Sequence, residues 1–404
     1  MNCRVQVAEI SMTGESDMSN YRQIEKMLDG FVEDGLPGCG CAFARDGVTL
    51  FEHYAGIDHV KTQHKLDAHT TFRQCSTTKI IIVTAGMMLY ERGKFLLNDP
   101  LYEYFPEYKE STVVEYDANG DAHIRPAKSP ILVKDAFRMT CGMPYEWGDS
   151  ITAKAMWDVK RELEKKYGTY DIETEVAAMG TVPKAFDPGT HWLYGYGHDI
   201  VSGLIQRLSG MPTGEFLRKE IFEPLGMNET AYRFHDGNES KLCDVFHPNG
   251  DGTWHSEPGI LDQYHAPEAK LENGGAGLYS TVSDYLKFTQ MLANGGRYHG
   301  EQIIGRKTID LMRENQLDKR LLKDFQNFYL AGYGYGLGVR TLLSRAEGNF
   351  NATPGEFGWT GAYGTYVSID PAEHFSLVYM HQTDPNNEQY YHLRVRNAVY
   401  GAIE

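Results

Sequence analysis

Two residues whose chemistry could cooperate, Ser76 and Lys79, stand three positions apart in the stretch QCSTTK (residues 74–79). On a helix this spacing places both side chains on one face, about one turn apart. A serine hydroxyl is a weak nucleophile and needs a base within reach. A lysine can act as that base when burial disfavours its charged form. The pair therefore predicts a serine nucleophile that is activated by a lysine.

The residues after this pair indicate a buried helix that would hold both side chains. The run IIIVTAGMML (80–89) is apolar on nearly every side, which is typical of a helix inside a core. The first turn of such a helix has free backbone N–H groups and the positive end of the helix dipole, which would stabilise an oxyanion beside Ser76. Because Ser-x-x-Lys is a short pattern, the alternative is a serine that only caps a core helix, with an ordinary first-turn lysine.

Two further stretches carry residues suited to the same chemistry. In PGTHWLYGY (188–196), a turn delivers Tyr194 and Tyr196 just before an amphipathic run, and a tyrosine near a buried lysine can shuttle protons. In GWTGA (358–362), glycines flank the start of a strand, so backbone N–H groups can approach a bound carbonyl. The alternatives are packing aromatics in the first stretch and a plain strand start in the second.

Composition and charge exclude several other classes of protein. The 404 residues are 41% hydrophobic and 23% charged, which is ordinary for a globular protein with two lobes or one large domain. The net charge of −16 and the absence of a Lys/Arg cluster argue against nucleic-acid binding. The sequence has no apolar run of membrane-span length, and the N-terminal segment MNCRVQVAEISMTGESDMS has no signal-peptide core. We therefore expect a cytoplasmic protein without membrane contact.

The sequence carries no cofactor or metal motif. It has no P-loop, no His-Glu-x-x-His, no Gly-x-Ser-x-Gly and no dinucleotide-binding glycine loop, and its 15 histidines lack metal-ligand spacing. We expect neither a cofactor nor a metal. The six cysteines form no Cys-x-x-Cys pair, so we expect reduced structural thiols rather than metal ligands at Cys3, Cys39, Cys41, Cys75, Cys141 and Cys243.

Hydrophobic patterns predict helix and sheet at both ends of the chain and a mostly helical middle. Apolar spacing predicts a helix over 21–33, and Asp46-Gly47 between two apolar runs predicts a hairpin of strands 40–44 and 48–54. A second hairpin is expected around Asn119-Gly120. Further strands are expected at 335–339, 363–369 and 375–381, and helices at 132–139, 153–166, 200–208, 282–292 and 390–403.

Taken together, these stretches resemble the motifs of the serine β-lactamase and penicillin-binding-protein superfamily, of the class C β-lactamase-like kind. Supporting matches are the segments MTCGMP (139–144), PGT (188–190), FEPLGM (222–227) and residues 274–294. The similarity runs from roughly residue 25 to the C-terminus. The three motifs occur in the expected order as Ser76-x-x-Lys79, Tyr194-x-Tyr196 and Trp359-Thr360-Gly361.

The resemblance implies an α+β fold. An antiparallel sheet flanked by helices would face a mostly α-helical lobe, with the active site in the cleft between them. Residues 1–75 and 260–404 would form the sheet lobe and residues 76–259 the helical lobe, within one functional domain.

The resemblance also implies roles for the matched residues. Ser76 would be the acylated nucleophile, Lys79 its base partner and Tyr194 the proton relay. The backbone N–H groups of Ser76 and Ala362 would form the oxyanion hole. The residues expected to bind substrate are Tyr196, Trp359, Thr360 and Gly361.

Two positions depart from the penicillin-recognising members. Those members usually have Lys or His where this chain has Trp359, and Asn where it has Tyr196. Both changes replace polar recognition with aromatic surface, which suits a neutral acyl group better than an anionic β-lactam or a D-alanyl carboxylate. Trp at this position resembles the family VIII carboxylesterases and related acyltransferases. We therefore expect a serine hydrolase that cleaves small-molecule carboxylic esters, with acyl transfer as an additional ability.

Two alternatives stay open at this point. A β-lactamase or D-amino-acid peptidase would need another cation in the cleft, for which Arg340 is a candidate. A non-catalytic acyl-binding or scaffold protein on the same fold would not need Ser76, Lys79 and Tyr194 together, and their joint presence argues against it. The sequence leaves the oligomeric state open.

Overall fold

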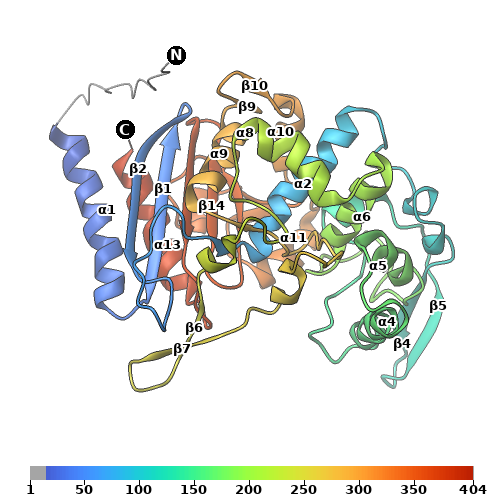
Figure 1. The fold of residues 1–404 in the computed structure, drawn as a ribbon. Coiled ribbons are helices and arrows are strands. Elements are labelled where there is room, and N and C mark those ends of the chain that lie inside the picture. Colours follow the sequence, from blue (N-terminus) through green and yellow to red (C-terminus); the bar gives the residue numbers. More distant parts are fainter. Residues whose placement is uncertain (1–14, 404) are drawn as a thin grey trace, which may run out of the picture.

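A seven-stranded antiparallel sheet forms the centre of the molecule in a computed structural model that describes residues 15–403, with helices on both faces (Figure 1). The sheet joins the two ends of the chain, because Gly40 pairs with Met380 and Arg45 with Phe375. In sheet order the strands are β11 (Tyr333–Tyr335), β12 (Arg340–Leu342), β13 (Phe357–Thr360), β14 (Tyr366–Asp370), β15 (Phe375–Met380), β1 (Gly38–Arg45) and β2 (Val48–Gly56).

Successive side chains of β15 bind helices on opposite faces of the sheet, as the pleat requires. The ring of Phe375 lies 5.3 Å from that of Tyr400 on α13 (Glu388–Ala402). The next residue, Ser376, accepts a hydrogen bond of 2.9 Å from Thr289 on α9 (Val282–Ala293). The helix α1 (Glu15–Glu33) packs beside α13, so the sheet is covered by these two helices on one face and by α9 on the other.

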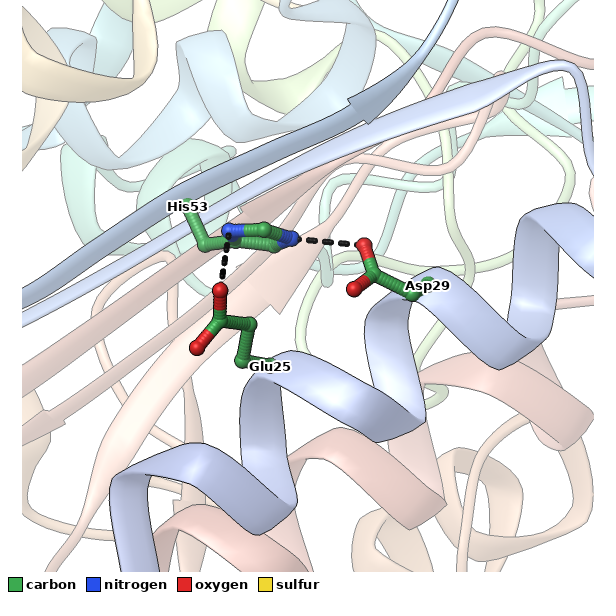
Figure 2. A group of neighbouring side chains, drawn as sticks. All are labelled: Glu25, Asp29 and His53. Carbon is green, nitrogen blue, oxygen red and sulfur yellow. Dashed lines mark hydrogen bonds and ion pairs between the residues drawn. The ribbon is translucent and has the colours of Figure 1, made fainter. Parts of the chain in front are cut away.

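An ion-pair clamp attaches α1 to the edge strand β2. Figure 2 shows the His53 imidazole between two carboxylates that lie four residues apart on α1. Nε2 of His53 is 2.8 Å from Asp29 Oδ1, and Nδ1 is 3.9 Å from Glu25 Oε1. Each of these three side chains has an atom that could bind a metal ion, and the three atoms lie within 4.8 Å of one another. Because the carboxylates meet different ring nitrogens, we interpret the group as a clamp that covers an edge strand.

The part of the sequence between β2 and β11 is mostly helical, and α2 (Thr78–Glu91) is its central buried helix. This helix is buried from Thr78 to Leu89 and packs against α6 (Gly197–Ser209). The remaining helices are α3 (Val133–Phe137), α4 (Ile151–Tyr167), α5 (Ile172–Met179), α7 (Thr213–Leu217), α8 (Glu223–Leu225), α10 (Arg306–Arg313), α11 (Lys319–Phe328) and α12 (Arg345–Gly348).

Within residues 15–403, four small two-stranded sheets complete the fold. The predicted hairpin at Asn119-Gly120 is present as β4 (Thr112–Tyr116) and β5 (Ala122–Pro126). The others pair β3 (Phe72–Arg73) with β8 (Tyr279–Ser280), β6 (Val245–Pro248) with β7 (Trp254–Glu257), and β9 (Arg297–Tyr298) with β10 (Glu301–Gln302).

The predicted α+β class is confirmed, and one predicted strand is wrong. Residues 336–339 form the turn between β11 and β12, because Gly338 takes a φ of +89° and the N–H of Gly336 donates to the carbonyl of Val339 at 2.8 Å. The strand expected from residue 363 begins at Tyr366 instead, after a turn at Gly364 with φ +109°. The division of the chain into lobes at residues 75 and 260 stays a prediction.

The five cysteines of the described chain are buried and free, as expected, and Cys3 lies outside that part. The N-terminal segment used to predict localisation lies largely outside it as well. Within residues 15–403, no helix combines the length and the apolar character needed to cross a bilayer.

Candidate active site

Ser76 sits in a strained turn that leads into α2. Cys75 to Thr77 form one 3₁₀ turn, and Cys75 has a φ of +46°, in the left-handed region that a residue with a side chain rarely adopts. Such strain costs on the order of 1–3 kcal/mol and persists only where the surroundings enforce it. Here the carbonyl of Gln74 accepts hydrogen bonds from the hydroxyls of Thr77 and Thr365, at 2.8 and 3.0 Å. These bonds fix the turn that presents Ser76.

The structure brings Ser76, Lys79 and Tyr194 together. The Tyr194 hydroxyl donates to Ser76 Oγ at 2.6 Å, and Lys79 Nζ donates to the same oxygen at 3.1 Å. Lys79 Nζ also donates to the carbonyl of Gly275 at 2.5 Å and lies 4.7 Å from the centre of the Tyr194 ring. The nucleophile oxygen therefore has two groups in contact that can accept or return a proton.

A buried carboxylate, which the sequence analysis missed, lies behind Lys79. Asp199 accepts the N–H of Gly275 through Oδ1 at 3.1 Å, and its Oδ2 has no hydrogen-bond partner in the described part of the chain. Burial raises the pKa of Asp199, and the charge of Lys79 opposes that rise. Asp199 lies on the first turn of α6, where sequence reasoning assigns an acidic residue to the helix dipole.

Gly275 leaves room for this polar cluster because it has no side chain. A Cβ at this position would lie 2.3 Å from the Tyr145 hydroxyl oxygen, 2.9 Å from Asp199 Oδ2 and 3.4 Å from Lys79 Nζ. Three polar groups from distant segments thus meet around one α-carbon. Tyr145 directly follows the predicted motif segment 139–144, which is the sequence signal that could have identified it.

Trp359 supports Tyr194 and does not face the substrate cavity. The indole is 2% exposed, stacks on Tyr194 with ring centres 5.8 Å apart, and donates from Nε1 to the Tyr194 oxygen at 3.4 Å. Its other neighbours include Tyr329, whose ring is 5.4 Å away. The expectation that Trp359 offers substrate an aromatic surface needs correction: the surrounding rings cover it, so it acts on Tyr194.

The rest of the third motif shapes the backbone beside the nucleophile. The N–H of Gly361 donates to the carbonyl of Thr365 at 2.8 Å, and the partly exposed Thr360 closes β13. Ala362 lines the cavity next to Ser76, and its carbonyl accepts from Asn386 at 2.8 Å. The role of the Ser76 and Ala362 N–H groups as an oxyanion hole stays a prediction.

Tyr196 lines the cavity, but its hydroxyl contacts both partners of a half-buried ion pair. That hydroxyl donates to Glu146 and accepts from Lys160 Nζ at 3.3 Å, while Lys160 binds Glu146 at 3.1 Å. The ring of Tyr196 also contacts Tyr145, with centres 4.8 Å apart. Tyr196 therefore contributes an aromatic wall whose polar atom is already satisfied.

Arg340 is not the additional cation that a penicillin-recognising site would require. Its guanidinium is fully buried on β12, where it binds Glu356 at 3.1 Å and the carbonyl of Val367 at 2.9 Å. It does not line the cavity that contains Ser76. Arg340 directly follows the strand expected at 335–339, and the sequence could not reveal on which face of the sheet its side chain lies.

Ser76 and Lys79 line one wall of a cavity of about 360 Å³. Two other basic residues line it. Lys160 is paired with Glu146, and Arg161 is largely exposed, 3.9 Å from Asp158. Glu164 and Asp199 add negative charge to the lining. The buried basic residue of the lining is Lys79, and its Nζ already contacts Ser76 Oγ and the carbonyl of Gly275. The other two basic side chains that line the cavity, Lys160 and Arg161, each pair with a carboxylate.

Comparison with known proteins places this geometry in a family. A family model described as Beta-lactamase matches residues 24–401. The chain is 26% identical to Protein Rv1367c of Mycobacterium tuberculosis, over 78% of each chain. It is 22% identical to Esterase EstB of Burkholderia gladioli, over 87% of each. A solved structure titled "EstCE1, a hydrolase with promiscuous acyltransferase activity" superposes with a TM-score of 0.74 at 20% identity, covering 96% of this chain and 99% of the other. The chain belongs to the Beta-lactamase family.

Proposed function

We propose that this protein is a carboxylesterase that forms an acyl-enzyme on Ser76 and acts on neutral small-molecule esters. The observation that carries the proposal is the contact of Ser76 Oγ with both the Tyr194 hydroxyl and Lys79 Nζ at the wall of a ligand-sized cavity. A scaffold protein has no need of a strained turn that presents a hydroxyl to two proton-transfer groups.

The chemistry follows from these contacts. Ser76 Oγ attacks the ester carbonyl carbon, and its proton passes to the Tyr194–Lys79 pair. The carbon–oxygen bond of the tetrahedral intermediate then breaks, and Tyr194 returns a proton to the leaving alkoxide. The N–H groups of Ser76 and Ala362 would stabilise the oxyanion. A water molecule attacks the acyl-enzyme with the same pair as base and releases a carboxylic acid, whereas an alcohol yields a new ester.

The surroundings of Ser76 favour a neutral ester over a β-lactam. The buried lysine of the cavity wall, Lys79, already contacts Ser76 Oγ and the carbonyl of Gly275. The half-buried Lys160 is paired with Glu146, and Arg340 is buried with Glu356 outside the cavity. The carboxylate of an anionic β-lactam would therefore have to draw a basic group of the lining away from its present contacts, which is costly. Two similar proteins carry matching names: EstB is called an esterase, and EstCE1 a hydrolase with promiscuous acyltransferase activity.

The proposal is tested with p-nitrophenyl acetate and butyrate beside a chromogenic cephalosporin, using the wild type and Ser76→Ala. We expect ester turnover that the variant loses by at least about a thousand-fold, with slow cephalosporin cleavage. Mass spectrometry of the quenched reaction should detect an acyl group on the peptide that contains Ser76. Ester turnover that survives in Ser76→Ala would overturn the mechanism, and faster cephalosporin cleavage would overturn the substrate class.

A further inference from the structure

Three large apolar side chains lie exposed at the mouth of the cavity that contains Ser76. Trp147 is 73% exposed, Ile260 60% and Trp157 52%, and all three line this cavity. They come from separate parts of the chain: the loop after residue 144, the segment before residue 262, and α4. Single exposed apolar residues are ordinary, but three that converge on one opening are typical of a ligand-binding surface.

The exposed surface continues as an aromatic wall to the nucleophile. Trp147 stacks on Tyr145 with ring centres 4.7 Å apart, and Tyr145 makes an edge contact of 5.7 Å with Tyr194. Tyr194 in turn binds Ser76 Oγ. The stacking holds Trp147 in place although most of its surface is open, so it offers a fixed face rather than a loose side chain.

The carboxylate beside Trp147 in the chain is already partnered. Glu146 is bound by Lys160 and by the hydroxyl of Tyr196. A charged group of a ligand would therefore have to compete with an existing ion pair, whereas an apolar group would only cover exposed rings. The cavity volume of about 360 Å³ is of the size that small-molecule sites need.

We propose that Trp147, Trp157 and Ile260 form the subsite for a bulky, neutral, apolar group of the ester, and that a flat ring or a medium-length chain is its preferred occupant. The inference rests on the proposed function, because the subsite is useful only if an ester is cleaved at Ser76. The same apolar chemistry could belong to the acyl part or to the alcohol part of the ester, and two substrate series distinguish these sources.

The test compares specificity ratios rather than single rates. The acyl series is p-nitrophenyl acetate, butyrate and octanoate, and the alcohol series is p-nitrophenyl acetate and 1-naphthyl acetate. The variant is Trp147→Ala/Trp157→Ala. The matched control is Tyr167→Ala, because Tyr167 lies on the same helix α4 and is 50% exposed but does not line the cavity.

For the wild type we expect kcat/KM to rise about ten-fold from acetate to octanoate, or from the one-ring to the two-ring acetate. The double variant should lose most of that ratio, and Tyr167→Ala should keep it. The series in which the ratio falls identifies the part of the ester that binds at Trp147 and Trp157. A flat ratio in the wild type, or equal ratios in the double variant and the control, would overturn the subsite.

A binding measurement separates this inference from the proposed function. Ser76→Ala should bind 1-naphthyl acetate without turnover, and calorimetry should show binding weakened about ten-fold when Trp147→Ala/Trp157→Ala is added. Absence of Ser76-dependent turnover of p-nitrophenyl acetate would contradict the proposed function. Turnover without the expected loss of binding would contradict only the subsite.

Discussion

Asp199 and Lys79 hold Gly275 from two sides: the carboxylate accepts its N–H at 3.1 Å, and Lys79 Nζ donates to its carbonyl at 2.5 Å. The buried acid is thereby linked to the nucleophile through one backbone residue, since Lys79 also binds Ser76 Oγ. Removing one part should disturb the geometry of the rest.

The first prediction concerns the charge of Asp199. Asp199→Asn keeps an oxygen to accept the Gly275 N–H but removes the negative charge near Lys79. We expect kcat for p-nitrophenyl butyrate to fall about ten-fold, with KM little changed and the pH profile displaced. Asp199→Ala also removes the acceptor of the Gly275 N–H, so its kcat should be lower still. Wild-type kcat and pH profile in a folded Asp199→Asn would show that the carboxylate only packs.

The second prediction concerns the space at Gly275. A methyl group in Gly275→Ala would contact the Tyr145 hydroxyl, Asp199 Oδ2 and Lys79 Nζ. We expect a folded protein with at least about a hundred-fold lower kcat, because the Tyr145 hydroxyl and the Asp199 carboxylate beside Lys79 must shift. The control is Gly148→Ala, since Gly148 has open space at its Cβ position and an ordinary φ. Circular dichroism and ester kinetics on both variants decide the point, and equal activities would contradict it.

The third prediction concerns Trp359 as a support for Tyr194. Trp359→Phe keeps a ring but removes the indole N–H that reaches the Tyr194 oxygen at 3.4 Å. We expect kcat to fall about three- to ten-fold, against roughly a thousand-fold for Tyr194→Phe, which removes the proton relay itself. Tyr329→Phe, which keeps the ring stacked on Trp359, is the control and should retain activity. A Trp359→Phe effect on KM alone would instead indicate contact with substrate.

The fourth prediction concerns acid stability. Burial lowers the pKa of His198 to about 3 and that of His381 to about 4. Their unfolded forms take up a proton near the ordinary value of about 6.5, so lowering the pH through that value favours the unfolded chain. Each histidine should remove about 2 kcal/mol of the free energy of unfolding between pH 7 and pH 5.

His381→Gln should reduce that loss by the contribution of one histidine. Urea denaturation of the wild type and the variant at pH 7 and pH 5 measures the difference. The exposed His69→Gln is the control, since its side chain is already in solvent. A pH dependence that is identical in His381→Gln and in the wild type would contradict the assignment.

The fifth prediction concerns the buried pair of Arg340 and Glu356. Removing one partner leaves a buried charge alone, so Arg340→Met should lower the free energy of unfolding by about 3–5 kcal/mol. Arg340→Met/Glu356→Gln should recover much of this loss. The KM for p-nitrophenyl butyrate should stay close to the wild-type value in the double variant. A KM raised many-fold there would mean that Arg340 recognises substrate after all.

Local motifs made part of this site predictable from the sequence. Ser76 and Lys79 are fixed by the geometry of one helical turn, and Tyr194 stands at a turn before an amphipathic helix. The hairpin of β1 and β2 could be predicted from Asp46-Gly47 between two apolar runs, and the strands β14 and β15 from their apolar residues. These features depend on residues that are close in the chain, which is where pattern reasoning is strongest.

The remaining features depend on contacts between distant segments. From the sequence alone, Asp199 is an ordinary acidic residue at the start of a helix. Its link to the site depends on Gly275, a distant residue that donates its N–H to the carboxylate. From the sequence alone, Trp359 was expected to contact substrate. In the structure, the aromatic rings around it bury the indole. The strand expected at 335–339 is replaced after Tyr335 by a tight turn that contains Gly336 and Gly338. In each case tertiary packing decided between two local interpretations that the sequence allowed.

The pairing of β1 with β15 has a consequence for biosynthesis. Gly40 leaves the ribosome long before Met380, its partner in the sheet, and at ordinary translation speeds the delay is roughly tens of seconds. During that time one edge of β1 can pair with β2, but the edge that later pairs with β15 has no native neighbour. The central sheet can therefore close only after β15 has been synthesised. Nascent chains of this protein should depend on holdase chaperones, and those that stop before β15 should be degraded rather than become partly active enzymes.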